Sequence, residues 1–245
     1  MARAKKRKET GEATRERILV TGERLMAERG LDGVSLRELT SLADVNLASV
    51  HYHFGSKEEV LAEVFALRAK PLAERRLEML AAVRREADGR PVLEDVLDAF
   101  LRPSLEIARQ EGGEHFLRLR ARLAYERNET SRAILAEAFD RSSAAFLAAL
   151  GEALPELPKL DLYWRFHFML GAMSYTMANP GRIQSLTKDV CDAGDMETAL
   201  HYMIPFLIAG FTSQPLAGNG MAAPAAERNA GKKPATRAKR KAAGD

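Results

Sequence analysis

The stretch of sequence that decides the fold is residues 17–61, which read RILVTGERLMAERGLDGVSLRELTSLADVNLASVHYHFGSKEEVL. Its apolar residues recur at helical spacing, and the first helix ends at Gly30, because glycine readily takes the left-handed conformation that closes helices. Three later helices each begin at a side chain that can cap the first amide groups: Ser35, Asn46 and Ser56. Two short helices joined by a tight turn, with a supporting helix on either side, predict a helix-turn-helix unit.

The second helix of this pair covers residues 46–54, NLASVHYHF. Val50 and Phe54 are spaced to point inward, which leaves small and polar side chains on the other faces. Such groups suit the major groove of DNA, although any short amphipathic helix would show the same spacing. The residues expected to contact DNA are Ser35, Arg37, Leu47, Ala48, Ser49, His51, Tyr52, His53 and Lys57. Tyr52 and Lys57 are assigned to phosphate groups.

Residues 17–61 resemble the N-terminal domain of the TetR family of bacterial transcriptional repressors almost position by position. The pieces that carry the resemblance are Ala27-Glu28-Arg29-Gly30, Val34-Ser35-Leu36-Arg37-Glu38 and His53-Phe54-Gly55-Ser56-Lys57-Glu58. The resemblance implies a repressor that binds a palindromic DNA operator as a homodimer and is released by a small ligand. Three residues depart from the family pattern: Thr40, Asp44 and His51. Since His51 replaces a frequent tyrosine of the recognition helix, the DNA sequence preference stays open.

The chain's 37 Lys and Arg residues are unevenly placed against its 34 acidic residues. Residues 1–17 carry seven basic residues against three acidic ones, and residues 217–245 carry seven against two. The whole chain has a formal net charge of only +3, so the body between these ends is acidic and would by itself repel nucleic acid. We expect residues 1–13 to form a flexible basic arm, which either lies on DNA or only improves solubility. Residues 217–245 are expected to form a disordered tail, with or without nonspecific DNA contacts.

Almost every segment between these ends shows helical spacing, and no alternating β-branched run is long enough for a sheet. The predicted fold class is therefore all-α, with a DNA-binding domain over residues 14–67 and a helical ligand-binding and dimerisation domain over residues 72–216. Pro71 is expected to kink or break the helix that begins at Ser56. Later helices are expected near residues 72–86, 92–110, 114–127, 130–151, 161–178 and 196–213, with a polar loop over 179–195.

The last two long helices carry apolar residues around their whole circumference, so each needs cover on two sides. The resemblance implies that they pair with their copies in a four-helix dimer interface. Packing within one chain would explain the same pattern. The residues assigned to the interface are Trp164, Phe168, Gly171, Ser174, Ala178, Met203, Leu207 and Phe211.

The other helices of this domain offer apolar side chains for a ligand cavity, although ordinary core packing explains them equally well. The candidates are Phe100, Phe116, Leu119, Leu123, Phe139 and Phe146, with Arg118 or Arg122 as the partner of a carboxylate. The run over residues 45–57, the step Arg102-Pro103 and residues 161–180 are similar to the fatty-acid-responsive, PsrA-like branch of the family. Together these features indicate a small hydrophobic effector such as a fatty acid or an acyl-CoA.

Other classes of function have less support. His51 and His53 face away from each other on one helix, which disfavours a metal site, and the single cysteine, Cys191, lies among acidic residues that oppose thiolate formation. We expect neither an enzyme nor a cofactor, because no phosphate-binding glycine loop or nucleophile elbow is present. No apolar run is long enough to span a membrane, so we expect a cytoplasmic protein without a membrane partner. The alternative is a small α-helical enzyme or lipid-binding protein that carries a vestigial helix-turn-helix.

Overall fold

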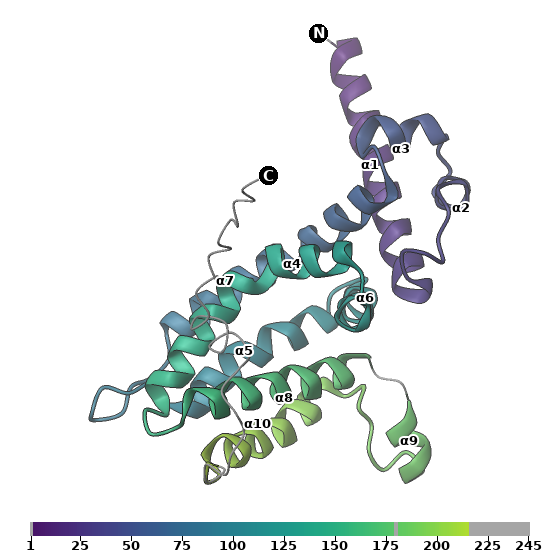
Figure 1. Ribbon diagram of the computed structural model, residues 1–245. Coiled ribbons are helices and arrows are strands. Elements are labelled where there is room, and N and C mark those ends of the chain that lie inside the picture. The colour runs from purple at the N-terminus through teal and green to yellow at the C-terminus, as the bar shows by residue number, and fades with distance from the viewer. Residues whose placement is uncertain (1, 179–180, 216–245) are drawn as a thin grey trace, which may run out of the picture. The chain divides into compact units, whose positions relative to one another are not determined.

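The computed structural model describes residues 2–178 and 181–215. Its regular elements in these ranges are ten helices and no β-strand, which confirms the all-α fold class (Figure 1). The helices are α1 (Ala2–Arg29), α2 (Leu36–Leu42), α3 (Leu47–His53), α4 (Lys57–Ala81), α5 (Leu93–Ala108), α6 (Gly113–Tyr125), α7 (Glu129–Ala153), α8 (Lys159–Ala178), α9 (Arg182–Thr187) and α10 (Met196–Thr212). The disordered tail predicted for residues 217–245 lies outside the described residues.

The turns and caps of the first four helices are those that the sequence predicts. Each of the three predicted caps accepts a hydrogen bond from an amide three residues ahead, at 2.8 to 3.2 Å: Ser35, Asn46 and Ser56. Gly30 follows α1 with φ +75°, and Asp44 makes the turn between α2 and α3 with φ +52°. Both angles lie in the left-handed region, which an aspartate tolerates better than most side chains.

The beginning of α1 differs from the prediction. The sequence predicts a flexible arm over residues 1–13, whereas the backbone is helical from Ala2 onward. The segment lacks an apolar stripe, but lysine, arginine and glutamate are strong helix formers. A helix that is nucleated by the buried part of α1 can therefore extend through a segment without an apolar stripe.

Pro71 does not interrupt α4, which runs without a break from Lys57 to Ala81. The proline removes one backbone donor, and the carbonyl that loses its partner belongs to Leu67, four residues earlier. Both residues are exposed, so water can bond that carbonyl. The opposite face of α4 is anchored by buried side chains such as Phe65. The predicted boundary between two domains, at residues 67–72, consequently lies inside one helix.

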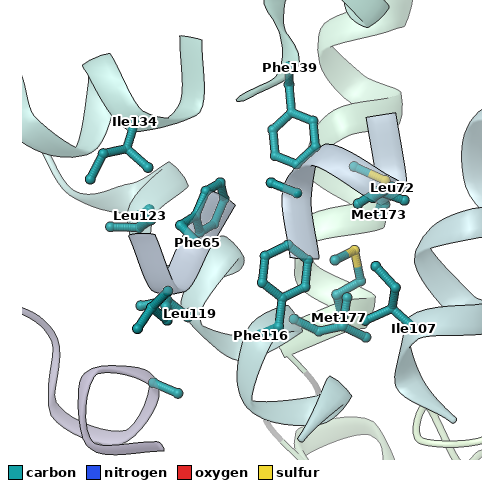
Figure 2. Close-up of a cluster of buried hydrophobic side chains, with 14 of the residues drawn as sticks. Phe65, Leu72, Ile107, Phe116, Leu119, Leu123, Ile134, Phe139, Met173 and Met177 are labelled. Atoms are coloured by element: carbon teal, nitrogen blue, oxygen red, sulfur yellow. The ribbon is translucent and has the colours of Figure 1, made fainter. Parts of the chain in front are cut away.

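The core behind α4 is built from aromatic and long apolar side chains. The ring of Phe65 meets Phe116 of α6 and Phe139 of α7, with centroids 5.2 and 5.8 Å apart. Figure 2 shows Met173 and Met177 of α8 reaching into the same cluster. Burial of each such side chain is worth roughly 1.5–3 kcal/mol, so this cluster is a main source of stability for the region.

Two further observations complete the architecture. The predicted polar loop over residues 179–195 contains a short helix, α9, which the weak periodicity of six residues did not reveal. No helix in the described part of the chain is both long and apolar enough to cross a membrane.

Candidate nucleic-acid interface and interior site

The short helix α3 has one exposed face, and buried side chains anchor its opposite face. Val50 is fully buried and Phe54 nearly so, which fixes the helix against the rest of the unit. Leu47 is 40% exposed and Tyr52 is 80% exposed. Ala48 and His51 are also exposed, and Ser49 is half-buried. Four of the predicted DNA contacts therefore share an accessible surface: Leu47, Ala48, His51 and Tyr52.

His51 has a defined orientation on this face. Its Nδ1 lies 2.9 Å from the carbonyl oxygen of Gly55. A carbonyl only accepts, so Nδ1 must carry the hydrogen, and Nε2 of the neutral ring is left as an acceptor. In this tautomer Nε2 can accept a hydrogen bond from the amino group of a cytosine or an adenine in the major groove.

Two of the other predicted contacts have different surroundings. His53 is half-buried and lies toward α1, where a Cβ atom added to Gly11 would be 3.8 Å from its Cε1. Ser35 uses its hydroxyl to cap α2. His53 was predicted to contact DNA; its side chain lies apart from the exposed face formed by Leu47, Ala48, His51 and Tyr52, because its position on α3 turns it toward the supporting helix. Arg37 is exposed.

Lys57 is also placed differently from the prediction. Its Nζ donates to the carbonyl oxygens of Leu31 at 2.9 Å and Val34 at 3.3 Å, and the residue is half-buried. These carbonyls follow α1, so the ammonium group ties the start of α4 to the loop before α2. The geometry assigns the side chain to the fold of the unit rather than to a phosphate.

The interior of the C-terminal region holds two buried arginines that the sequence analysis missed. Arg76 of α4 is fully buried and Arg120 of α6 is 7% exposed. Arg76 Nη2 and Arg120 Nη1 both donate to the Ser104 hydroxyl oxygen, at 2.9 and 3.2 Å, and Arg76 Nε donates to the Phe100 carbonyl at 2.8 Å. Arg76 Cζ lies 3.9 Å from the centroid of Phe100, and Arg120 Cζ lies 4.6 Å from that of Phe139.

Neither guanidinium has an acidic partner among residues 2–178 and 181–215. Among the residues that the structure describes, no aspartate or glutamate forms an ion pair with Arg76 or Arg120, and Arg76 Nη1 has no hydrogen-bond partner. Burial lowers the pKa of Arg120 to about 10. The pKa of Arg76 is lowered well below its usual value, first by burial and then by the charge of Arg120. The two positive charges therefore oppose each other in a dry environment.

The two arginines named in the prediction lie elsewhere. Arg118 is on the surface and pairs with Glu114 at 3.3 Å, and Arg122 Nη2 donates to the carbonyl of Glu28 in α1 at 3.0 Å. Neither points into the core, which corrects the prediction. A helical signal for Arg120 was present, since Phe116, Arg120 and Leu123 follow the spacing of one inward face.

The six apolar residues predicted to line a cavity are all buried: Phe100, Phe116, Leu119, Leu123, Phe139 and Phe146. They fill the core instead of lining the cleft of about 340 Å³ between α4 and α7. Phe100 and Phe139 nevertheless lie on the guanidinium groups of the buried pair.

The predicted dimer face is divided by the structure. Trp164 and Phe168 of α8 are 48% and 63% exposed, and Gly171 is exposed, while Ser174, Ala178 and Met203 are half-buried. Leu207 and Phe211 are buried within the chain, which contradicts their assignment to the interface. They occupy the face of α10 that packs inward.

The opposite face of α10 carries exposed aromatic residues that the prediction did not include. Tyr202 and Phe206 are 72% and 70% exposed, and they border a cleft of about 880 Å³ between α8, α9 and α10 together with Tyr175 and Leu186.

In the described residues no group of three or more His, Cys, Asp or Glu side chains is arranged to hold a metal ion, and Cys191 is exposed and free.

The N-terminal and the C-terminal regions of the chain each match a known protein family. Residues 18–64 match the family described as bacterial regulatory proteins, tetR family, and residues 98–210 match the tetracyclin repressor-like C-terminal domain. A stretch of 94 residues, 38% of this chain, is 30% identical to the HTH-type transcriptional regulator AcrR of Shigella flexneri and covers 43% of it. A stretch of 51 residues, 21% of this chain, is 45% identical to the HTH-type transcriptional repressor NemR of Escherichia coli K12 and covers 26% of it. The match thus spans less than half the length of either regulator.

Among solved structures, the fatty acid degradation regulator FadR from Bacillus halodurans is similar, with a TM-score of 0.59 and 14% sequence identity. The superposition covers 82% of this chain and 97% of that one. At this identity the likeness shows a shared fold.

Proposed function

The chain belongs to the TetR family, and from this premise we propose that it is a transcriptional repressor. We propose further that it binds a palindromic DNA operator as a homodimer. The observation that carries the proposal is the exposed face of α3, where Leu47, Ala48, His51 and Tyr52 stand clear of a buried anchor at Val50. A short helix that is held rigidly and carries small and polar groups outward has the form required for a major groove. The protein acts by binding, without catalysis, in the cytoplasm.

A homodimer supplies the second recognition helix. The exposed faces of α8 and α10, which carry Trp164, Phe168, Tyr202 and Phe206, need cover from another chain, since large apolar patches on a monomer mark interaction sites. Two copies of α3 would then read two half-sites at a separation that the dimer sets.

Release from DNA requires an effector that binds more tightly to a state in which this separation is wrong. Two polar links join α1 to the sensing region. Arg68 of α4 donates to both carboxylate oxygens of Glu23 at 2.6 and 3.1 Å and to the carbonyl of Glu111 at 2.6 Å. Arg122 of α6 holds the carbonyl of Glu28. A shift of α4 or α6 would therefore move α1 and the unit built on it.

We infer that the effector has an apolar, lipid-like body, such as that of a fatty acid or an acyl-CoA. The aromatic and methionine-rich interior supports this proposal, and FadR of Bacillus halodurans, which shares the fold, is described as a fatty acid degradation regulator. Each buried methylene contributes roughly 0.8 kcal/mol, or about fourfold in affinity. Long acyl chains should therefore release DNA at concentrations where short ones do not, and release that is independent of chain length would contradict a lipid effector.

The first experiment is a gel shift of the full chain on the DNA upstream of its own coding region, with an unrelated duplex of equal length as competitor. A regulator shifts the upstream fragment at concentrations that leave the unrelated duplex free. Tyr52→Ala should weaken the shift, whereas Tyr125→Ala, at an exposed position on α6, should not. Equal binding to both duplexes would favour a lipid-binding protein with a vestigial helix-turn-helix.

A further inference from the structure

Burial of Arg76 and Arg120 costs free energy, and no carboxylate among the described residues pairs with either charge. Transfer of one ion to a protein interior costs several kcal/mol after relaxation, and two like charges add mutual repulsion. Arg76 and Arg120 share one neutral acceptor, the hydroxyl of Ser104, and face the rings of Phe100 and Phe139. Hydrogen bonds to neutral groups and contacts with aromatic faces stabilise a cation less than a carboxylate does. An anion would complete this arrangement.

We propose that Arg76 and Arg120 form a receptor for the anionic head of the effector, a carboxylate or a phosphate, with Ser104 between them. This proposal rests on the proposed function for the existence of an effector, but the receptor can be tested without DNA. Arg76 Nη1 is buried and unpartnered among the described residues, so at least one strong donor is available to an incoming oxygen. Guanidinium groups suit this task because their planar donors match two oxygens at once.

The remaining donors of the pair face the side chains that can move most easily. Arg76 Nη2 lies 3.6 Å from Met173 Sδ, while Arg120 Nη1 lies 3.7 Å from Met177 Sδ and its Nη2 lies 3.9 Å from Met173 Sδ. A thioether is a weak acceptor, and methionine is flexible and tolerant of repacking. An anionic oxygen would displace these sulfur contacts with a large gain in hydrogen-bond strength, and the methionines can then pack along an apolar tail.

The position of the pair also explains how binding of the head group could affect the DNA-binding unit. Arg76 lies on α4, the same unbroken helix that begins beside α3, and Arg120 lies two residues before Arg122, which holds the end of α1. Neutralisation of the two charges removes their repulsion and allows α4 and α6 to approach. The anion thus acts at two of the helices that contact α1.

The test uses isothermal titration calorimetry of the full chain without DNA and compares three ligands that share one tail: dodecanoate, dodecyl phosphate and 1-dodecanol. The two anionic ligands are kept below their micelle concentrations, and the alcohol is kept below its solubility limit. We expect the anionic ligands to bind at least about tenfold more tightly than the alcohol, because a hydrogen bond to a charged group is worth about 1.4 kcal/mol or more. The carboxylate and phosphate arms show which head group the site prefers. Equal affinities for all three ligands, or no binding of any, would overturn the proposal.

Variants then show which residues cause the preference for anionic ligands. Arg76→Met and Arg120→Met should lose the preference for anions, whereas Arg118→Met, at an exposed position of the same α6, should keep it. The buried variants should retain or gain thermal stability, since replacing buried charges by apolar side chains is often neutral or stabilising. If they fail to fold, the comparison of head groups on the unmodified chain still decides. A preference that survives in both folded variants would refute the receptor.

The two proposals can fail separately. A chain that binds dodecanoate in preference to dodecanol, but shows no specific gel shift, would retain the receptor and remove the regulator. A chain that binds its upstream DNA and is released equally well by acid and alcohol would retain the regulator and remove the receptor.

Discussion

Replacing Lys57 by alanine separates two explanations for a basic residue next to the recognition helix. In the structure its ammonium group donates to the carbonyls of Leu31 and Val34, at 2.9 and 3.3 Å. Both of these residues are buried, at 7% and 2% exposure, so the variant leaves two carbonyl groups without their charged donor. A hydrogen bond to a charged group is worth about 1.5–3 kcal/mol. Because Lys57 is half-buried and one bond is long, we expect a loss of about 1.5–3 kcal/mol in total.

This loss should appear in thermal unfolding of the free protein. A chain of this size loses about 2–4 °C in melting temperature for each kcal/mol, so Lys57→Ala should melt about 3–12 °C below the unmodified chain. Lys70→Ala is the matched control, because Lys70 lies on the same helix and is exposed. Its melting temperature should stay within about 2 °C of the original.

The salt dependence of DNA binding completes the assay. A lysine that neutralises a phosphate contributes about 0.9 to the slope of log affinity against log salt. A lysine that holds the fold contributes nothing to this slope, even when the variant binds more weakly. The reasoning is refuted if Lys57→Ala keeps its melting temperature and loses about one unit of slope.

Three other substitutions and one deletion test the remaining parts of the proposal. His51→Ala should change the ranking of operator variants, because an exposed imidazole can bond a base edge, whereas Tyr52→Ala should weaken binding to all of them alike; a reversed pattern in a binding series would exchange the two roles. Deleting residues 2–8 removes five basic side chains and should flatten the salt slope, and an unchanged slope would place this segment away from DNA. Gly171→Leu should weaken the dimer in sedimentation without unfolding the chain, since a Cβ atom at this exposed position meets nothing within 4 Å; an intact dimer would move the interface away from Gly171.

The helix-turn-helix could be predicted closely because its signals are local. A cap needs only a side chain and the amide three residues ahead, and the turn at Asp44 needs only a residue that accepts positive φ. The continuity of α4 could not be predicted in this way. Pro71 has a local cost, but solvent on one face and burial of Phe65 on the other outweigh it, and both depend on helices distant in sequence.

The interior site was harder to predict, because an arginine in a sequence carries a strong expectation of exposure. Arg118, Arg120 and Arg122 alternate along α6, and successive members of such a set point about 200° apart on a helix. Arg118 and Arg122 therefore share the outer side with respect to the core, and Arg120 alone joins the inward face of Phe116. The signal that the sequence analysis missed was the angular position of Arg120 on the helix, which places it on the same face as buried apolar residues.

The unbroken run of α4 from Lys57 to Ala81 has a consequence for engineering sensors from this protein. In an α-helix each residue turns the chain by about 100° and advances it by about 1.5 Å, so the number of residues between two side chains sets the angle between them. An insertion or deletion of a single residue between Ala69 and Arg76 would leave both ends helical, yet would rotate Arg76 out of its position opposite Arg120. A chimera that joins this DNA-reading end to a foreign sensing region must therefore preserve the residue count through the junction, and substitutions should be tolerated there more readily than changes of length.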